Sequence, residues 1–256
     1  MTENISQLLE DWYARPFGQL AFQKIDEVVG KSLEHIFGYY LVQLGLARNM
    51  PLYHQSTIPT RIFLSNRSGA LIKLIASFEE LPIDSDSTDA VIGHHFLEFS
   101  KQPHRTLREI HRVLTPQGHL VLIGFNPYSL IGLGQLGLKL SGVRLWKGWS
   151  PISGARLKDW LHLLGFEIIS YDTLCHIPEM GSGKIRNLLI KLDNSFRESR
   201  LPVGGLFVIH AIKSVAGASS ISFKKARPQT LPGIRAPVPG VGAIIPNETS
   251  CLGKLS

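Results

Sequence analysis

Two histidines, an asparagine and a tyrosine stand directly after apolar runs that are typical of buried strands. His94 and His95 follow "DAVIG", and Asn126 follows "HLVLIGF", with Tyr128 two residues further on. An imidazole side chain takes up a proton near neutral pH, and an asparagine side chain offers both a carbonyl and an amide. These residues indicate a site that binds a polar ligand and accepts a proton. The alternative is that they are polar residues and a turn that end two strands.

A single glycine, Gly45, ends another strand-like run, "YYLVQL" at residues 39–44. Glycine lets a backbone come close to a ligand, so the position suits a nucleotide-binding loop as well as a plain turn. A dinucleotide-binding loop carries several glycines, and only one stands here. The short-chain dehydrogenases also need a lysine four residues after a tyrosine, and no tyrosine of this chain has one. Both observations argue against a nicotinamide-dependent dehydrogenase.

Strands that alternate with helices must position these residues. Apolar side chains at helical spacing from Ile5 to Trp12, and a second helical stretch at about 20–37, predict N-terminal helices within residues 1–38. A proline at the first position marks a further helix from Pro103. Strands are predicted at 39–44, 61–64, 71–76, 88–96, 119–125, 166–171 and 205–213, and another helix at 155–164. This order predicts an α/β fold with a mostly parallel sheet and helices on both faces. In such a sheet, ligands bind at the carboxyl ends of the strands.

The last part of the chain differs from the rest. Residues 214–256 are rich in Gly, Pro and Ser, and they carry five Lys or Arg against one acid, Glu248. Such a composition predicts a disordered basic tail after a domain that covers residues 1–213. A basic tail can touch nucleic acid non-specifically, but a solvated tail explains the charge as well, and nucleic acid is not the expected partner. Residues 130–142 are apolar and glycine-spaced, which predicts a lid or a surface segment over the pocket.

Several classes of protein are excluded by composition. The two cysteines, Cys175 and Cys251, form neither a disulfide framework nor a zinc-binding pair, and no spacing of side chains predicts a metal site. No window of the 256 residues approaches the roughly 18 consecutive apolar residues of a transmembrane helix. The first residues lack the apolar region of a secretory signal. We therefore expect a cytoplasmic protein, with an oligomeric state that the sequence leaves open.

Residues 78–133 resemble the central half of the class I S-adenosylmethionine-dependent methyltransferases, in the small-molecule branch called type 11. The residues that match the pattern of this family are Leu81, Pro82, Asp89, Val91, His94, His95, Leu97, Glu98, Pro103, Leu107, Glu109, Arg112, Val113, Leu114, Pro116, Gly118 and Leu120. The segment "GFNPYSL" at 124–130 looks like a bacterial subfamily related to the protein YafS. The resemblance covers residues 1 to about 213. It implies a Rossmann-like fold with an antiparallel last strand, and transfer of a methyl group from S-adenosylmethionine to a small molecule.

The resemblance also implies which residues bind the cofactor. Gly45 stands in the family's glycine loop after the first strand, and Gln43 holds the usual acidic position of that loop. At the end of the second strand, Ser65 or Asn66 replaces the acid that binds the ribose hydroxyls. Ser77 replaces the Asp that meets the adenine amine, and Phe78 and His94 complete the cofactor-binding set. Three expected acids are thus polar but uncharged, and neutral groups form weaker hydrogen bonds.

For the methyl acceptor, the resemblance implies a site at the ends of the fourth and fifth strands. In other branches of the family, an Asn-Pro pair at the place of Asn126 binds the nitrogen that is methylated. His95, Asn126 and Tyr128 are therefore the candidate catalytic residues, with His94, His95 or Tyr128 as the base. An alternative function is a non-catalytic protein of this fold that has lost part of its cofactor site and acts as a binding or scaffold module.

Overall fold

The computed structural model describes residues 3–142, 149–176 and 204–214, which fall within one compact unit. The predicted tail beyond Ser214 lies outside the described residues. The described helices are α1 (Glu3–Tyr13), α2 (Pro16–Leu33), α3 (Pro103–Val113), α4 (Leu130–Leu140) and α6 (Gly154–Leu163), with a short 3₁₀ helix η1 (Leu97–Phe99). The strands are β1 (Tyr40–Gly45), β2 (Thr60–Ser65), β3 (Leu74–Ile75), β4 (Thr88–His94), β5 (Leu114–Phe125), β6 (Phe166–Leu174) and β7 (Leu206–Lys213).

The seven strands form one sheet in the order β3-β2-β1-β4-β5-β7-β6. The first five of these strands run parallel to one another, and β7 is antiparallel to both of its neighbours. The predicted mostly parallel sheet with an antiparallel last strand is therefore confirmed. Strand order reverses between β1 and β4, which places the expected binding edge at the carboxyl ends of these two strands.

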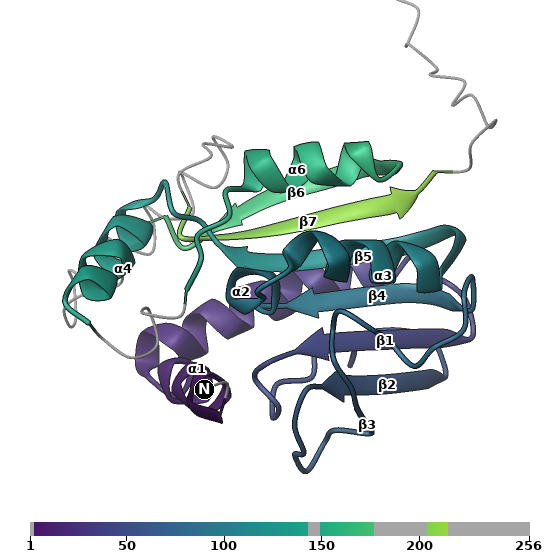
Figure 1. Cartoon of the computed structure of the whole chain (residues 1–256), viewed down its shortest axis with the longest axis horizontal. Coiled ribbons are helices and arrows are strands. Elements are labelled where there is room, and N and C mark those ends of the chain that lie inside the picture. Colours follow the sequence, from purple (N-terminus) through teal and green to yellow (C-terminus); the bar gives the residue numbers. More distant parts are fainter. Residues whose placement is uncertain (1–2, 143–148, 177–203, 215–256) are drawn as a thin grey trace, which may run out of the picture. The chain divides into compact units, whose positions relative to one another are not determined.

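Helices cover both faces of the sheet (Figure 1). On one face, α2 packs against β5, β6 and β7. On the other, α3 packs against β5 and α6 against β6, and the ring of His104 on α3 lies 3.9 Å from that of Trp160 on α6. Leu44, Ile92 and Val121, in the middle of three neighbouring strands, are fully or almost fully buried. A strand that is covered on both faces needs such a continuous apolar run.

Two predicted strands differ from the observed ones. The predicted strand at 71–76 is only the two-residue β3, because only Leu74 and Ile75 pair with residues of β2, although the neighbouring Ala76 N–H still donates to the Ser65 carbonyl. The strand predicted at 119–125 is longer, since β5 starts directly at Leu114 and pairs there with Thr88. Within the predicted lid or surface segment, residues 130–140 form the regular helix α4, which exposes Leu133, Leu136, Leu138 and Leu140.

Candidate functional site at the carboxyl ends of β1, β2 and β4

The parallel register brings the predicted residues of β1 and β4 side by side. Gly45 pairs with His94 across the β1–β4 ladder, and His94 pairs with Ile123 across the β4–β5 ladder. A side chain built on Gly45 would meet the ring of Phe63 at 3.3 Å and the Cβ atom of His94 at 3.6 Å. The absence of a side chain at Gly45 therefore leaves room for Phe63 of β2 and His94 of β4. The φ angle of Gly45 is not one that requires glycine.

A buried hydrogen-bond network joins α1 to the end of β4. The Tyr13 hydroxyl lies 2.6 Å from His95 Nε2 and 3.0 Å from His94 Nε2. His95 Nδ1 lies 2.9 Å from Glu98 Oε1, which also accepts the Phe125 backbone N–H at 3.0 Å. All four polar side chains are buried. The network therefore connects α1, β4, η1 and β5 through polar groups that are shielded from water.

The hydrogen bonds of this network assign the positions of its protons. A carboxylate oxygen such as Glu98 Oε1 accepts, so in the neutral form of His95 the proton lies on Nδ1 and Nε2 is the acceptor. The Tyr13 hydroxyl then donates to His95 Nε2 and accepts from His94 Nε2–H. His94 is left with an unprotonated Nδ1, a buried atom without a described partner. His95 has φ 48°, in the left-handed region that only a strongly constrained non-glycine residue adopts.

Burial fixes the charge state of two members of this network. Burial, helped by the negative charge of Glu98 and by Cys175, raises the pKa of Tyr13 well above its usual value. Burial and the neighbouring His95 lower the pKa of His94 well below its usual range. At neutral pH Tyr13 is therefore a phenol and His94 a neutral imidazole. The hydrogen bonds from Tyr13 to the two histidines and from His95 to Glu98 form a continuous path along which a proton can pass.

A cavity of about 500 Å³ lies beside the network, at the ends of β2 and β3. Three residues of the predicted cofactor set line it: Asn66, Ser77 and Phe78. Leu46, Ile5, Phe96 and Phe99 add apolar walls, and Arg67, Glu79, Ser100 and Lys101 add polar groups. Its volume is within the range of small-molecule sites.

Unpaired polar atoms at the end of β2 show that this edge has unused hydrogen-bonding capacity. Ser65 Oγ and Asn66 Oδ1 are buried and have no hydrogen-bond partner in the structure. Most buried polar atoms in proteins are paired, so such atoms need a specific explanation. Because Asn66 lines the cavity and Ser65 precedes it, these two oxygens fit a ligand that carries hydroxyl groups. The residues present are thus compatible with the ribose of the cofactor.

An acid also lines the cavity beside Ser77, one that the sequence analysis did not select. Glu79 accepts hydrogen bonds from Ser77 Oγ at 2.6 Å and Ser100 Oγ at 3.0 Å. Burial raises the pKa of Glu79, but these two hydroxyls, a backbone N–H and Arg105 outweigh it and the net pKa is lowered. Ser77 is therefore paired with a carboxylate two residues away, so Glu79 supplies the charge that Ser77 lacks.

Gln43 has a different role from the one predicted for it. Its side chain donates from Nε2 to the Met50 carbonyl at 2.9 Å and accepts the Leu52 N–H at Oε1 at 2.8 Å. Gln43 is fully buried, and both ends of its amide hold the irregular segment that joins β1 to β2. A glutamine suits this position because it offers one donor and one acceptor, whereas an acid would leave the Met50 carbonyl without a donor.

Asn126 and Tyr128 also lie differently from the expected arrangement. Asn126 Nδ2 donates to the Gly204 carbonyl at 2.9 Å, and its Oδ1 accepts the Tyr128 N–H at 3.1 Å. The Tyr128 side chain is 76% exposed. Neither residue lines the 500 Å³ cavity, and His95 does not line it either. The three catalytic candidates remain predictions, and Asn126 already binds the backbone on both sides of its amide.

The structure adds Tyr13, Glu10 and Arg48 to the site, and the sequence analysis missed all three. Tyr13 lies on α1 and binds His94 and His95, and the Glu10 carboxylate binds Arg48 in the segment after β1. Tyr13 is separated from His95 by more than 80 residues, so no local motif joins them. The one available signal was its place on the apolar face of α1, where a tyrosine needs a partner for its hydroxyl.

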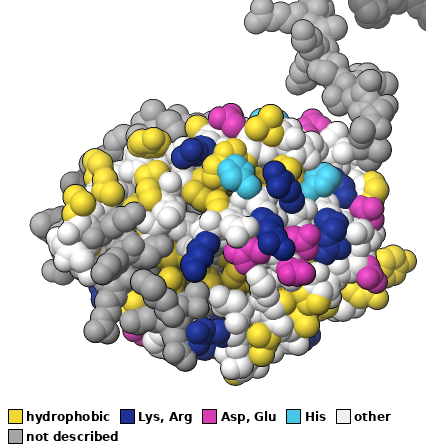
Figure 2. Space-filling model, viewed as in Figure 1, with side chains coloured by type: hydrophobic (Ala, Val, Ile, Leu, Met, Phe, Trp, Pro, Cys, Tyr) yellow, Lys and Arg dark blue, Asp and Glu magenta, His cyan; other side chains and the backbone are white. Residues whose placement is uncertain are grey.

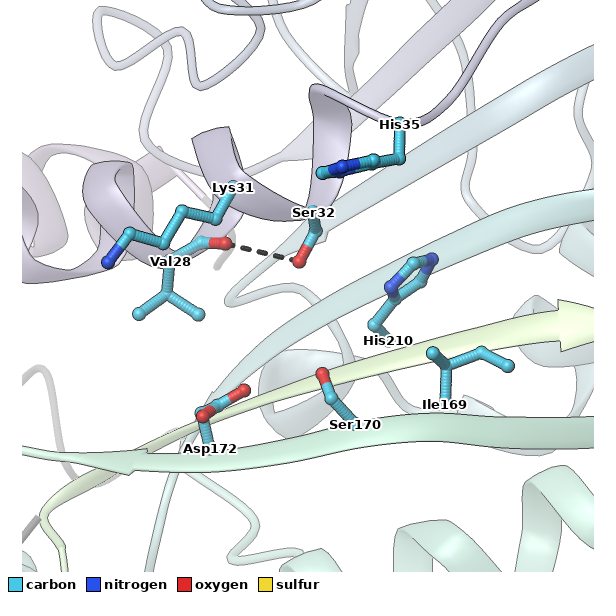
Figure 3. Close-up of a pocket in the computed structure, with 8 residues that line it drawn as sticks. All are labelled: Val28, Lys31, Ser32, His35, Ile169, Ser170, Asp172 and His210. Atoms are coloured by element: carbon cyan, nitrogen blue, oxygen red, sulfur yellow. Dashed lines mark hydrogen bonds between the residues drawn. The ribbon is translucent and has the colours of Figure 1, made fainter. Parts of the chain in front are cut away.

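A second cavity, of about 460 Å³, lies between α2 and the strands β6 and β7 (Figure 3). Lys31 of α2 and His35, just after this helix, face Ser170 and Asp172 of β6 across it, and His210 of β7 forms part of its floor. His210 Nε2 lies 3.0 Å from His119 Nδ1. This cavity is beside the middle of the strands rather than at their carboxyl ends, so we do not assign the cofactor to it.

Charged side chains of both signs mix on the face drawn in Figure 2. Arg112 pairs with Glu109 at 2.8 Å, and Arg105 with Glu80 at 3.8 Å. An electrostatic binding surface for nucleic acid needs basic groups that are not neutralised in this way. Within the described ranges, no helix is long and apolar enough to cross a membrane, and no group of three or more His, Cys, Asp or Glu side chains is placed to hold a metal ion.

Comparison with known proteins agrees with this geometry. Residues 58–122 match a family described as a methyltransferase domain. The uncharacterized protein YafS of Escherichia coli K12 is 28% identical over 182 residues, which cover 69% of this chain and 73% of YafS. The fold is that of the class I methyltransferases. The sequence resemblance to this family is thus confirmed.

Solved structures show the same fold at low sequence identity. A methyltransferase of Thermotoga maritima, described as S-adenosylmethionine-dependent and as a "possible histamine N-methyltransferase", has a TM-score of 0.57 and 18% identity, over 83% of this chain and 97% of its own. The [4+2]-cyclase SpnF has a TM-score of 0.51 and 16% identity, over 75% of this chain and 81% of its own. Since a cyclase shares this methyltransferase fold, the fold alone does not decide the reaction.

Proposed function

We propose that this protein is an S-adenosylmethionine-dependent methyltransferase that acts on a small molecule in the cytoplasm. The observation that carries the proposal is the cavity at the ends of β2 and β3, which Asn66 lines: Asn66 and the preceding Ser65 each have a buried oxygen without a partner among the described residues. The position of the cavity in a methyltransferase fold supports the same conclusion. S-adenosylmethionine, when bound, supplies a methyl group that is already activated by its sulfonium charge.

In this proposal, each wall of the cavity holds one part of the cofactor. Asn66, with Ser65 behind it, would accept hydrogen bonds from the ribose hydroxyls, and Ser77 with Glu79 would meet the adenine amine. Phe78 and Phe96, whose ring centroids lie 5.3 Å apart, give an apolar surface for the base. Gly45 leaves the end of β1 open beside Leu46. The sequence prediction assigned Gly45, Ser65, Asn66, Ser77 and Phe78 as well. It also included Gln43 and His94, which this proposal does not use, and it lacked Glu79 and Phe96.

The Tyr13–His95–Glu98 chain is the proton acceptor of this proposal. An acceptor that bears a proton gives it to the Tyr13 oxygen, while the Tyr13 hydroxyl passes its own proton to His95 Nε2. Glu98 then stabilises the imidazolium through the bond to His95 Nδ1. A relay is needed because His95 is fully buried, whereas Tyr13, the last residue of α1, lines a small cavity of about 270 Å³. Positioned acid–base groups of this kind contribute about 10²–10⁴-fold to a rate.

The second candidate function is a binding or scaffold protein without catalysis. One specific observation favours it: α1 covers the ends of β1 and β4, and the Tyr13 hydroxyl is hydrogen-bonded to both His94 and His95. A protein whose site is permanently closed in this way would bind neither cofactor nor acceptor there. The two functions therefore differ in a property that is measured directly, the affinity for the cofactor.

Calorimetric titration of the full chain with S-adenosylhomocysteine, the demethylated product, tests the proposed function. We expect one binding site per chain with an affinity in the micromolar range or weaker, because neutral groups replace two or three acids at the cofactor. Adenosine should compete for it, since the cavity is assigned to the nucleoside. No measurable heat with either S-adenosylhomocysteine or S-adenosylmethionine would favour the scaffold function.

Restoring an acid at the end of β2 should strengthen cofactor binding. Asn66→Asp keeps the size of the side chain and converts a neutral acceptor into a charged one, which is worth roughly 1 kcal/mol more per hydrogen bond. We expect the affinity for S-adenosylhomocysteine to rise about fivefold to tenfold.

The control for this change is Gln117→Glu, which adds the same charge at an exposed position near the start of β5, outside the 500 Å³ cavity. Calorimetry on both variants and the parent gives the comparison. An equal effect of both substitutions would show a general response to charge, and a loss of affinity in Asn66→Asp would remove Asn66 from the ribose site.

A further inference from the structure

A carboxylate of the chain itself is bound to the segment that follows β1. Glu10 Oε1, on α1, accepts the Arg48 backbone N–H at 2.9 Å and Arg48 Nε at 3.1 Å, and Glu10 Oε2 lies 3.4 Å from Arg48 Nη2. The side chains are only 13% and 23% exposed for Glu10 and Arg48. Charge-assisted bonds with both edges of a guanidinium are among the strongest in proteins, particularly where water is largely excluded.

Arg48 extends this contact to the end of β2. Its Nη1 donates to the Ser68 carbonyl at 3.0 Å, and its side chain packs against Gly69. Arg48 thus joins α1 to the segments after β1 and β2, at the edge where the 500 Å³ cavity lies. Leu46, two residues before Arg48, and Ile5, on the same helix as Glu10, are both walls of that cavity.

The donors that hold Glu10 are not specific for a glutamate side chain. A backbone N–H and the Nε–Nη2 edge of a guanidinium form a receptor for any carboxylate that arrives in the same plane. Glu10 and a ligand carboxylate cannot use these donors at the same time, and their like charges would repel at that distance. A ligand with a carboxylate must therefore displace Glu10, whereas a ligand without one need not.

We propose that Arg48 is the anchor for a carboxylate of the bound ligand, and that Glu10 occupies this anchor until the ligand displaces it. The proposal rests on the proposed function, because it identifies the carboxylate as that of the amino-acid part of S-adenosylmethionine. In this proposal, Arg48 binds the amino-acid part of the cofactor. In related methyltransferases this part lies against a loop with several glycines, and only Gly45 remains of that loop here. Glu10 weakens ligand binding, because the ligand must first displace it from Arg48. In the absence of ligand, Glu10 holds α1 against the segment that follows β1.

The displacement of Glu10 has a consequence for α1. The helix has two polar anchors on the body, Glu10 on Arg48 and Tyr13 on the two histidines of β4, and these anchors lie one turn apart. A carboxylate ligand removes the first anchor and leaves the second. Cofactor binding therefore loosens the helix that covers the Tyr13–His95–Glu98 chain, which couples occupancy of the cofactor site to entry of the second substrate.

Two nucleosides that differ in their carboxylate test this proposal. S-adenosylhomocysteine carries the amino-acid part, and 5′-methylthioadenosine has the same thioether nucleoside without it. Both are titrated by calorimetry into the full-length parent, Glu10→Gln and Arg48→Met, and circular dichroism checks the fold of each variant. Asp11→Asn is the matched control, because it removes one negative charge from the exposed side of the same helix.

We expect Glu10→Gln to bind S-adenosylhomocysteine about tenfold more tightly and Arg48→Met to bind it at least tenfold more weakly. The affinity for 5′-methylthioadenosine should change by less than a factor of about two in both, and Asp11→Asn should resemble the parent. Arg48→Lys, which keeps the charge but loses the planar edge, should give an intermediate loss and replaces Arg48→Met if that variant does not fold.

Equal changes for both nucleosides, or an unchanged affinity for S-adenosylhomocysteine in Glu10→Gln, would refute the anchor while leaving the proposed function intact. Absence of binding of either nucleoside to the parent and to every variant would instead refute the proposed function, and the anchor with it. The two nucleosides thus distinguish failure of the Arg48 anchor from failure of the proposed function.

Discussion

Glu98→Ala will lower the free energy of unfolding by about 3–5 kcal/mol, the cost of breaking a buried charged network by removing one partner. The Glu98 carboxylate is 4% exposed and accepts from His95 Nδ1 and from the Phe125 N–H through one oxygen. Its removal leaves a buried backbone N–H and a buried imidazole N–H without acceptors, and it opens a cavity between η1 and β5. Urea denaturation at pH 7 gives the value.

A matched control separates this effect from the loss of any surface carboxylate. Glu80→Ala removes a glutamate whose side chain is 84% exposed and which lies 3.8 Å from Arg105. Exposed ion pairs contribute between about 0 and 1 kcal/mol, so this variant should stay close to the parent. Glu98→Gln should fall between the two, because the amide oxygen can keep one of the two bonds. A loss below about 1 kcal/mol in Glu98→Ala would mean that the network does not hold β4 to β5.

The protein will also lose stability on acidification between about pH 6.5 and pH 4. Burial, and then the neighbouring His119, lower the pKa of His210 from the model-peptide value of 6.5 to about 4. In this window the unfolded chain binds a proton at His210 and the folded chain does not, so stability falls as the pH falls. The loss begins near pH 6.5 and is complete below about pH 4. Burial lowers the pKa of His94 as well, which adds to the loss in the same direction.

The expected size follows from the shift in the pKa of His210. At about 1.4 kcal/mol per pKa unit, the shift corresponds to at most about 3 kcal/mol. Partial access of water to the cavity at His210 reduces this to about 2 kcal/mol. Urea denaturation at pH 7, 5.5 and 4.5 measures the slope. His210→Gln should remove most of this contribution, and His54→Gln, at an exposed position, should keep the slope of the parent. A parent whose stability does not change down to pH 4.5 would contradict the prediction.

The sequence alone determined the class of fold and most of its elements. Apolar runs such as 119–125 are long enough for a strand that is buried on both faces, and the proline at 103 marks the first position of α3. These features arise from local periodicity, which tertiary contacts only reinforce. Where local signals were weak, the prediction of the boundaries failed: the two-residue β3 lies in a segment without alternation, and β5 starts before its glycine because Thr88 offers Leu114 a ladder partner.

Part of the candidate site was also predictable from the sequence. Residues that directly follow parallel strands come together at one edge of the sheet, even when they are far apart in the chain. Gly45 and His94 are neighbours for this reason, and so are the oxygens of Ser65 and Asn66 near the cavity. These residues follow strands, and the carboxyl ends of parallel strands meet at one edge. Their chemistry was therefore predictable from a local pattern and a topological rule.

Only the tertiary structure decided what each polar group binds. Gln43 and Asn126 occupy predicted positions, yet their amides are satisfied by backbone groups of other segments. Tyr13 joins His95 across more than 80 residues, and Glu10 reaches Arg48 across 38. A hydrogen bond depends on distances of a few tenths of an ångström between groups that the chain brings together only on folding. Residue types and spacing fix which partners are chemically suitable, while the packing of α1 on the sheet fixes which of them meet.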